Sequence, residues 1–251
     1  SLDIKETGVK VSWRPYSADK NYEWRLAGTT PLDEFRLPRG VVHIKLEKET
    51  YQTKHIVEAN PSFLFDNHPI PPTFQLVPIE MYKKESIPEG MVAIDGGNFI
   101  PALIGEGITD YNLSTYFIDK YEVSNKEYKE FVDAKGYELF QYWSDMEFIL
   151  DGESLSWEEA KKLMVDSTGR QGPANWELGS YKDGEANLPV TGISWYEAQA
   201  YAKYKGNILP PMYHWAKAAF PAAEIGAPIS SVLVKKSNFS TTKHGKKITY
   251  S

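Results

Sequence analysis

Apolar residues occupy every second position in several short segments near the start of the chain. The clearest case runs from Val42 to Leu46, where polar residues separate the apolar ones as in a half-buried strand. Val9 to Trp13 repeats this period, and Pro38-Arg39-Gly40 marks a turn between such segments. Short strands separated by turns predict a small all-β sandwich over residues 1–60.

Prolines gather in the next part of the chain, where six of the sixteen lie between Pro61 and Pro88. Proline fixes φ and lacks a backbone N–H, so this stretch cannot form a regular helix or a central strand. Residues 61–90 are therefore predicted to be a connector, with one edge strand at residues 74–77.

Three predicted helix starts in the second part of the chain carry the same motif. Ser124, Ser156 and Ser194 are each followed three positions later by a glutamate. In such a capping box the serine hydroxyl accepts from a free amide and the glutamate accepts from the serine amide. A fourth helix is predicted to begin at Pro210-Pro211, since proline suits the first helical turn.

Tryptophans are expected to lie in the core where they follow the helical spacing, and a long loop is expected between the second and third predicted helices. Trp157, Trp195 and Trp215 lie at helical positions and are predicted to be buried. Residues 166–187 are rich in Gly and Asn and predict a long loop. Loops of this length are unusual unless they have a function.

Four residues in or near loops are candidates for ligand binding, namely Trp143, Asn175, Trp176 and Tyr181. Loop residues of these types can line a groove for a peptide or a sugar. The alternative is that the aromatic rings fill the core of a helix-poor domain. His214 is a further binding candidate because histidine commonly serves as an acid, a base or a metal ligand. The alternative is that it packs or faces solvent.

Composition and charge narrow the possible functions of the 251 residues. The net charge of −6 argues against nucleic-acid binding through phosphate neutralisation. No apolar stretch reaches the roughly 18 residues that a membrane-spanning helix needs. The chain has no cysteine, which excludes disulfides and thiolate metal sites, and no two histidines have the spacing of a zinc motif. We therefore expect neither a cofactor nor a metal site.

Four segments in order, residues 91–99, 121–131, 188–198 and 209–216, resemble motifs of the formylglycine-generating enzyme family, also called the sulfatase-modifying factor domain. The resemblance implies an irregular α+β domain related to C-type lectins over residues 91–251, of which this chain holds the N-terminal portion. The pieces within residues 24–49 resemble a PEGA-like β-sandwich module.

The order of these two modules resembles the outer portion of certain bacterial transmembrane serine/threonine kinases, and residues 166–179 resemble that subgroup in particular. The chain itself contains no glycine-rich ATP loop and no catalytic-loop motif of a kinase. The resemblance thus implies an extracytoplasmic region, with a kinase domain elsewhere in the full-length protein.

The resemblance also implies how the enzymes of the family work, and this chain departs from that pattern. Those enzymes oxidise a substrate cysteine with a pair of their own cysteines, which hold a copper ion and lie in the C-terminal half of the domain. A second branch uses iron held by histidines from an added helical domain, which we do not find here. We expect this chain, which has no cysteine, to share the fold without the catalysis.

Three functions follow from these observations. The leading hypothesis is a non-catalytic extracytoplasmic region that senses or binds a peptide, glycan or protein ligand within a larger bacterial signalling protein. The second is part of a formylglycine-generating oxidoreductase whose catalytic half lies outside the chain. The third is a structural scaffold. Fold alone does not decide among them.

Overall fold

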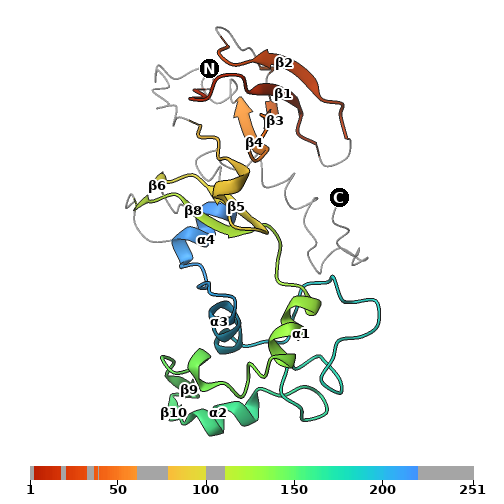
Figure 1. The fold of residues 1–251 in the computed structure, drawn as a ribbon, viewed down its shortest axis with the longest axis vertical. Coiled ribbons are helices and arrows are strands. Elements are labelled where there is room, and N and C mark those ends of the chain that lie inside the picture. Colours follow the sequence, from red (N-terminus) through yellow and green to blue (C-terminus); the bar gives the residue numbers. More distant parts are fainter. Residues whose placement is uncertain are drawn as a thin grey trace. The chain divides into compact units, whose positions relative to one another are not determined.

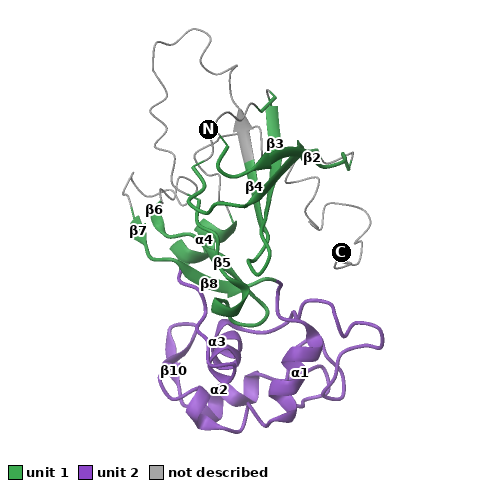
Figure 2. Cartoon of the chain, turned by 45° about the horizontal axis from the view of Figure 1, so that its top comes forward, with its two compact units in different colours: residues 1–120, 212–246 green, residues 121–211, 247–251 purple. Residues whose placement is uncertain are grey.

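The computed structural model describes residues 3–17, 21–32, 37–38, 40–60, 79–99 and 111–219. The chain divides into two compact units, coloured separately in Figure 2. Unit 1 combines Ser1–Lys120 with Met212–Lys246, and unit 2 combines Tyr121–Pro211 with Lys247–Ser251. The domain boundaries at residues 60 and 90 stay a prediction.

Unit 1 begins with a four-stranded antiparallel sheet in the order β2-β1-β3-β4 (Figure 1). Its strands are β1 (Lys10–Pro15), β2 (Arg25–Thr29), β3 (Gly40–Glu47) and β4 (Lys54–Asn60). Val42, Ile44 and Leu46 of β3 are buried and their neighbours are not, so the alternation predicted there is confirmed. The described part of residues 1–60 holds this one sheet, and the PEGA-like sandwich stays a prediction.

One face of the sheet is covered by residues from the later part of the proline-rich stretch. Met81 is buried against Val9, Val11 and the apolar side chains of β3. Ile79 forms a parallel bridge with Ile4, and a short 3₁₀ helix follows at Lys84–Ser86. The predicted edge strand at residues 74–77 lies outside the described residues.

Two small antiparallel pairs and one helix complete unit 1. Strand β5 (Met91–Ile94) pairs with β8 (Tyr116–Asp119), and β6 (Gly97–Phe99) pairs with β7 (Tyr111–Leu113). Helix α4 (Met212–Ala219), the predicted fourth helix, packs on β7 by stacking Tyr213 on Tyr111.

Unit 2 contains α1 (Asn125–Asp133), α2 (Trp157–Leu163) and α3 (Trp195–Tyr204). All three predicted capping boxes form, with the serine of each motif at the N-cap. A 3₁₀ helix at Phe140–Tyr142 and a hairpin of β9 (Phe148–Leu150) and β10 (Glu153–Leu155) lie between α1 and α2. The described residues thus combine helices and sheets, as the predicted α+β class requires; the lectin-like description stays a prediction.

The burial predicted for the helix tryptophans is confirmed only in part. Trp157 is partly buried, with its ring 4.6 Å from that of Trp143 between centroids. Trp195 and Trp215 are 62% and 53% exposed, so the prediction was wrong for both. Trp195 is the first residue of α3, where a side chain leans back beyond the helix start.

Trp215 is exposed because its helix packs through another side. The side chains of Tyr213 and His214 contact the tyrosines of β7 and β8. Lys217, one helical turn after Tyr213, donates to backbone carbonyls of the β5–β6 turn. Trp215 follows Tyr213 by two positions, and residues two apart on a helix do not share a face.

Candidate functional site

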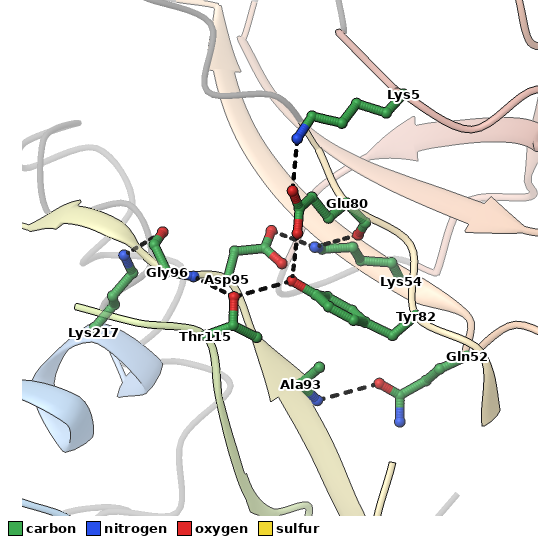
Figure 3. A network of polar contacts seen from close by, with 10 residues as sticks. All are labelled: Lys5, Gln52, Lys54, Glu80, Tyr82, Ala93, Asp95, Gly96, Thr115 and Lys217. Carbon is green, nitrogen blue, oxygen red and sulfur yellow. Dashed lines mark hydrogen bonds and ion pairs between the residues drawn. The ribbon is translucent and has the colours of Figure 1, made fainter. Parts of the chain in front are cut away.

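Unit 1 contains a pocket of about 340 Å³ at the base of the β6–β7 hairpin. Its walls come from four parts of the sequence: the N-terminal segment, the segment before β5, the β5–β6 turn, and the end of β7. Figure 3 shows most of these side chains in one polar network. The pocket is lined by Lys5, Glu80, Asp95, Gly96, Gly97, Leu113 and Thr115.

An ion pair between Lys5 and Glu80 lies at this pocket, with 2.6 Å between Nζ and Oε1 (Figure 3). The second carboxylate oxygen of Glu80 accepts from the Tyr82 hydroxyl at 3.1 Å. The hydrogen bond from Lys5, followed by that from Tyr82, lowers the pKa of Glu80. Glu80 therefore stays a carboxylate near neutral pH.

Tyr82 links the two sides of the network. Its hydroxyl lies 3.3 Å from the Oγ1 atom of Thr115, which in turn accepts from the Gly96 N–H at 3.2 Å. Burial, together with the nearby carboxylate of Asp95, raises the pKa of Tyr82 to about 12. Tyr82 thus keeps its proton near neutral pH and cannot serve there as a base.

Lys54 forms a second ion pair, with Asp95, and its Nζ also donates to the backbone carbonyl of Glu80 at 2.9 Å. Both side chains of the pair are less exposed than those of Lys5 and Glu80. Charges of opposite sign therefore alternate through the network. Such a pocket can hold a charged polar ligand. Each carboxylate has a lysine partner, so neither is arranged to act as a general acid.

Side chains from the segment between β3 and β4 and from α4 form hydrogen bonds with the backbone of this region of unit 1. Gln52 donates to the carbonyl of Met91 at 3.2 Å and accepts from the N–H of Ala93 at 3.4 Å. Lys217 of α4 donates to the carbonyl of Gly96 at 2.9 Å (Figure 3). Gly96 has to be glycine, because an added Cβ would lie 2.6 Å from the carbonyl oxygen of Leu113.

None of the residues in this network was a predicted site residue. Asp95 and Gly96 lie within the motif at residues 91–99, which was the one available signal. Lys5, Lys54 and Glu80 come together through sheet pairing between distant segments, and no local pattern marks them. Only the structure shows that these three residues lie together.

The predicted tryptophans lie in the core of unit 2. Trp143 has no exposed surface and donates from Nε1 to the carbonyl of Gly136 at 2.9 Å. Trp176 is 2% exposed and donates to Oδ1 of Asn125 at 3.0 Å. Both indole N–H groups are therefore satisfied internally, as expected of buried tryptophans. In this conformation neither ring offers a surface to a ligand, which corresponds to the alternative that they fill the core.

The other predicted residues keep some exposure, and only some of them lie together. Asn175 is exposed and donates to the Thr191 hydroxyl at 2.7 Å. Tyr181 is partly buried with its ring edge on Trp176, 5.5 Å between centroids. His214 lies in unit 1, with its ring 4.7 Å from that of Tyr116. The structure thus groups Asn175, Trp176 and Tyr181 and assigns His214 to another unit.

The predicted long loop is held by a buried carboxylate. Asp166 is 4% exposed and accepts from the N–H and hydroxyl of Thr168, both at 2.8 Å. It also accepts from the N–H groups of Arg170 at 3.0 Å and Gly179 at 2.6 Å. These donors fix the loop that carries Asn175 and Tyr181.

The described residues give no support for a metal or a membrane span. Within them, no three His, Asp or Glu side chains gather closely enough to hold an ion. The copper ion implied for the enzymes of the family needs cysteine ligands, and the sequence has none, so the donor set does not fit that ion. No helix in the described ranges has the length and apolarity to cross a bilayer.

Comparison with known proteins relates most of the chain to one family. The family described as "Sulfatase-modifying factor enzyme 1-like domain" matches residues 79–241. The formylglycine-generating enzyme of Thermomonospora curvata is 32% identical over 162 residues, which cover 54% of this chain and 50% of that enzyme. An uncharacterized protein of Bacillus subtilis, YfmG, is 32% identical over 157 residues, 56% of this chain and 27% of that protein.

A kinase also matches part of the chain. The serine/threonine-protein kinase Pkn1 of Chlamydia trachomatis is 26% identical over 168 residues, which cover 64% of this chain and 24% of the kinase. In all three relatives the aligned part makes up half or less of the relative's own length.

Proposed function

The chain belongs to the sulfatase-modifying factor enzyme 1-like domain family, and from this premise we propose that it is a non-catalytic sensing or ligand-binding region of a larger bacterial signalling protein. In this proposal the full-length protein contains a serine/threonine kinase, and the region described here lies outside the cytoplasm. Its task is to bind a peptide, glycan or protein.

The observation that carries the proposal is the polar network at the pocket of unit 1. Its side chains favour binding over proton transfer, because Glu80 is held ionised by Lys5 and Tyr82 keeps its proton. The thiol pair that the family resemblance implies for oxidation of a substrate cysteine belongs to the C-terminal half of the domain, and these 251 residues contain no cysteine. The described pocket is thus equipped for recognition.

The kinase architecture draws its support from the relatives. Proteins named serine/threonine-protein kinase Pkn1 from Chlamydia trachomatis and Chlamydia caviae both align with this chain. Each is several times longer than the aligned part, which leaves room for a kinase domain. The extracytoplasmic location follows from the same architecture and is part of the proposal.

Two places in the chain are proposed to contact ligand. The first is the pocket of unit 1, where Lys5 and Glu80 offer charges of both signs. The second is the loop at residues 166–187 of unit 2, where Asn175 and Tyr181 are accessible and Trp176 supports them from the core. His214 is proposed as a separate contact on α4.

The first experiment uses the full-length gene product. We expect the purified protein to autophosphorylate in the presence of ATP and magnesium, and to leave a cysteine-containing sulfatase peptide unchanged by mass spectrometry. Conversion of that cysteine to an aldehyde would overturn the non-catalytic assignment. Absence of any kinase activity would contradict the proposal that the full-length protein contains a serine/threonine kinase. The binding role is tested separately by the second experiment.

The second experiment measures binding as a rise in the unfolding midpoint when peptide and glycan sets are added. Lys5→Gln should abolish the shift of a pocket ligand. Lys135→Gln, which changes an exposed lysine of unit 2 that also pairs with a glutamate, is the control and should leave the shift unchanged. If no compound shifts the wild-type protein, a binding role fails and the scaffold alternative takes its place.

A further inference from the structure

The outer face of the four-stranded sheet differs in charge from the rest of the molecule. Residues opposite each other in an antiparallel pair lie on the same side of the sheet. Because Val42, Ile44 and Leu46 face the core, the residues between them face outward. Pairing along β1, β3 and β4 then gathers six ionisable side chains on this outer face: Lys10, Arg14, His43, Lys45, Glu47 and His55.

This face is basic in a protein of net charge −6. Lys10, Arg14 and Lys45 provide three positive charges, and Glu47 provides one negative charge, paired with Lys45 at 3.0 Å. Two histidines add further charge when protonated. The face therefore attracts anions even though the whole protein repels them.

Trp24 holds two of the cations in place. The guanidinium carbon of Arg14 lies 4.5 Å from the centroid of the Trp24 ring, and Nζ of Lys45 lies 4.8 Å from it. Ser12 is 4% exposed although it lies on the outer face, which is consistent with side chains covering it. Cations fixed in this way lose little conformational freedom when they meet an anion.

The two histidines meet across neighbouring strands. Nε2 of His43 and Nδ1 of His55 are 3.0 Å apart, and the rings of Tyr16 and Trp24 pack on His43. A single proton can be shared at this distance, whereas a second proton places two positive rings side by side.

The charged groups around the pair set how it titrates. Burial lowers the pKa of His55, and the charges of Lys45 and Arg14 lower it further. Lys120 acts in the same direction, and Glu47 opposes it. A bound anion would offset these positive charges and favour protonation of His55. By thermodynamic linkage, protonation must then strengthen anion binding by the same factor by which a bound anion favours protonation.

We propose that this basic face, formed by Lys10, Arg14, Trp24, His43, Lys45 and His55, binds an acidic glycan, with an affinity that rises as the pH falls. Carboxylate or sulfate groups of the glycan meet the fixed cations, and the rings of Tyr16 and Trp24 provide aromatic surface for the sugar. The face shares no residue with the pocket of unit 1, so this proposal and the proposed function can fail separately.

The test is isothermal titration of the full chain with an oligogalacturonate of defined length at about pH 5.5 and about pH 8. We expect binding that is at least about tenfold tighter at the lower pH and that weakens with added salt. The double variant Arg14→Gln/Lys45→Gln should lose about tenfold or more at both pH values. Lys126→Gln/Lys182→Gln, which removes the same charge from exposed sites in unit 2, should bind like wild type.

The double variant His43→Gln/His55→Gln separates the two parts of the proposal. It should bind the oligogalacturonate with the same affinity at the two pH values, because the pH-dependent charge is gone. Each variant is first checked for an unchanged unfolding midpoint. Absence of binding to the oligogalacturonate, or equal loss in the unit 2 control, overturns the proposal. Binding to anionic phospholipid vesicles or to single-stranded DNA in place of the glycan overturns it as well.

Discussion

The indole N–H of Trp176 donates a hydrogen bond to Oδ1 of Asn125, with 3.0 Å between the two heavy atoms. Asn125 is the first residue of α1, and its Nδ2 donates to the backbone carbonyl of Glu185 at 2.9 Å. One buried amide therefore ties α1 to two points of the loop at residues 166–187. This contact, and not exposure, explains why a tryptophan occurs in that loop.

Asn125→Ala is expected to destabilise unit 2. It leaves the Trp176 N–H without its acceptor, and burying an unpaired polar group costs about 1–3 kcal/mol. It also removes one of two donors to the Glu185 carbonyl, which keeps the N–H of Leu188 at 3.0 Å. Chemical denaturation followed by tryptophan fluorescence measures the loss. Asn112→Ala, which truncates an exposed asparagine in β7, serves as the control. Equal stability of Asn125→Ala and wild type would show that the bridge contributes nothing.

The two ion-paired lysines of the network in Figure 3, Lys5 and Lys54, should differ in their contribution to stability. Lys54→Met leaves Asp95 without a counter-charge in a half-buried setting, and we expect a loss of about 1–3 kcal/mol in the free energy of unfolding. Lys5→Met breaks an exposed pair and should cause no measurable loss, since exposed ion pairs contribute little. The same denaturation experiment on both variants decides the point. A larger effect for Lys5→Met would reverse this assignment.

The sequence predicts the parts of this fold that depend on neighbours in the chain. Each capping box involves residues three apart, so Ser124, Ser156 and Ser194 could be placed at helix starts from local pattern alone. The alternation of apolar and polar residues in β3 likewise predicted which of its side chains face the core.

Features that depend on long-range pairing could not be predicted in this way. His43 and His55 have no ligand spacing, and they meet because β3 and β4 pair in one particular register. Trp195 has helical spacing, yet its position at the helix start leaves it outside the core. The pocket of unit 1 depends on the approach of residues 3–5 to residues 79–80, which no local signal marks.

Gly136→Ala is expected to disturb the core of unit 2 through one specific clash. An added Cβ would lie 2.0 Å from the ring of Phe131, which is fully buried. We expect a loss of about 1–3 kcal/mol, the usual cost of overpacking. Phe131→Leu should make room for the methyl group, so the double variant should be more stable than the sum of the two single losses predicts. Strict additivity in this double-mutant cycle would contradict the proposed clash.

Asp166 should make the stability of unit 2 depend on pH in the acid range. Burial alone would raise its pKa, but the hydrogen bonds from Gly179, Thr168 and Arg170 outweigh burial and lower the pKa from 3.8 to about 2. A carboxyl group with a lowered folded-state pKa stabilises the fold above its unfolded-state pKa, and this contribution is lost as the pH falls from about 4 to about 2.

Asp166→Asn tests this dependence directly, because an amide cannot titrate and its nitrogen cannot accept the bonds that one carboxylate oxygen accepts. We expect the variant to be less stable than wild type at neutral pH by roughly 2 kcal/mol. The difference should shrink below about pH 4 and nearly vanish near pH 2. Carbon-13 NMR of the Asp166 carboxyl in the wild-type protein measures the same pKa independently. A midpoint near 4 would mean that the four donors do not hold the ionised form, and that the loop is fixed by its other contacts.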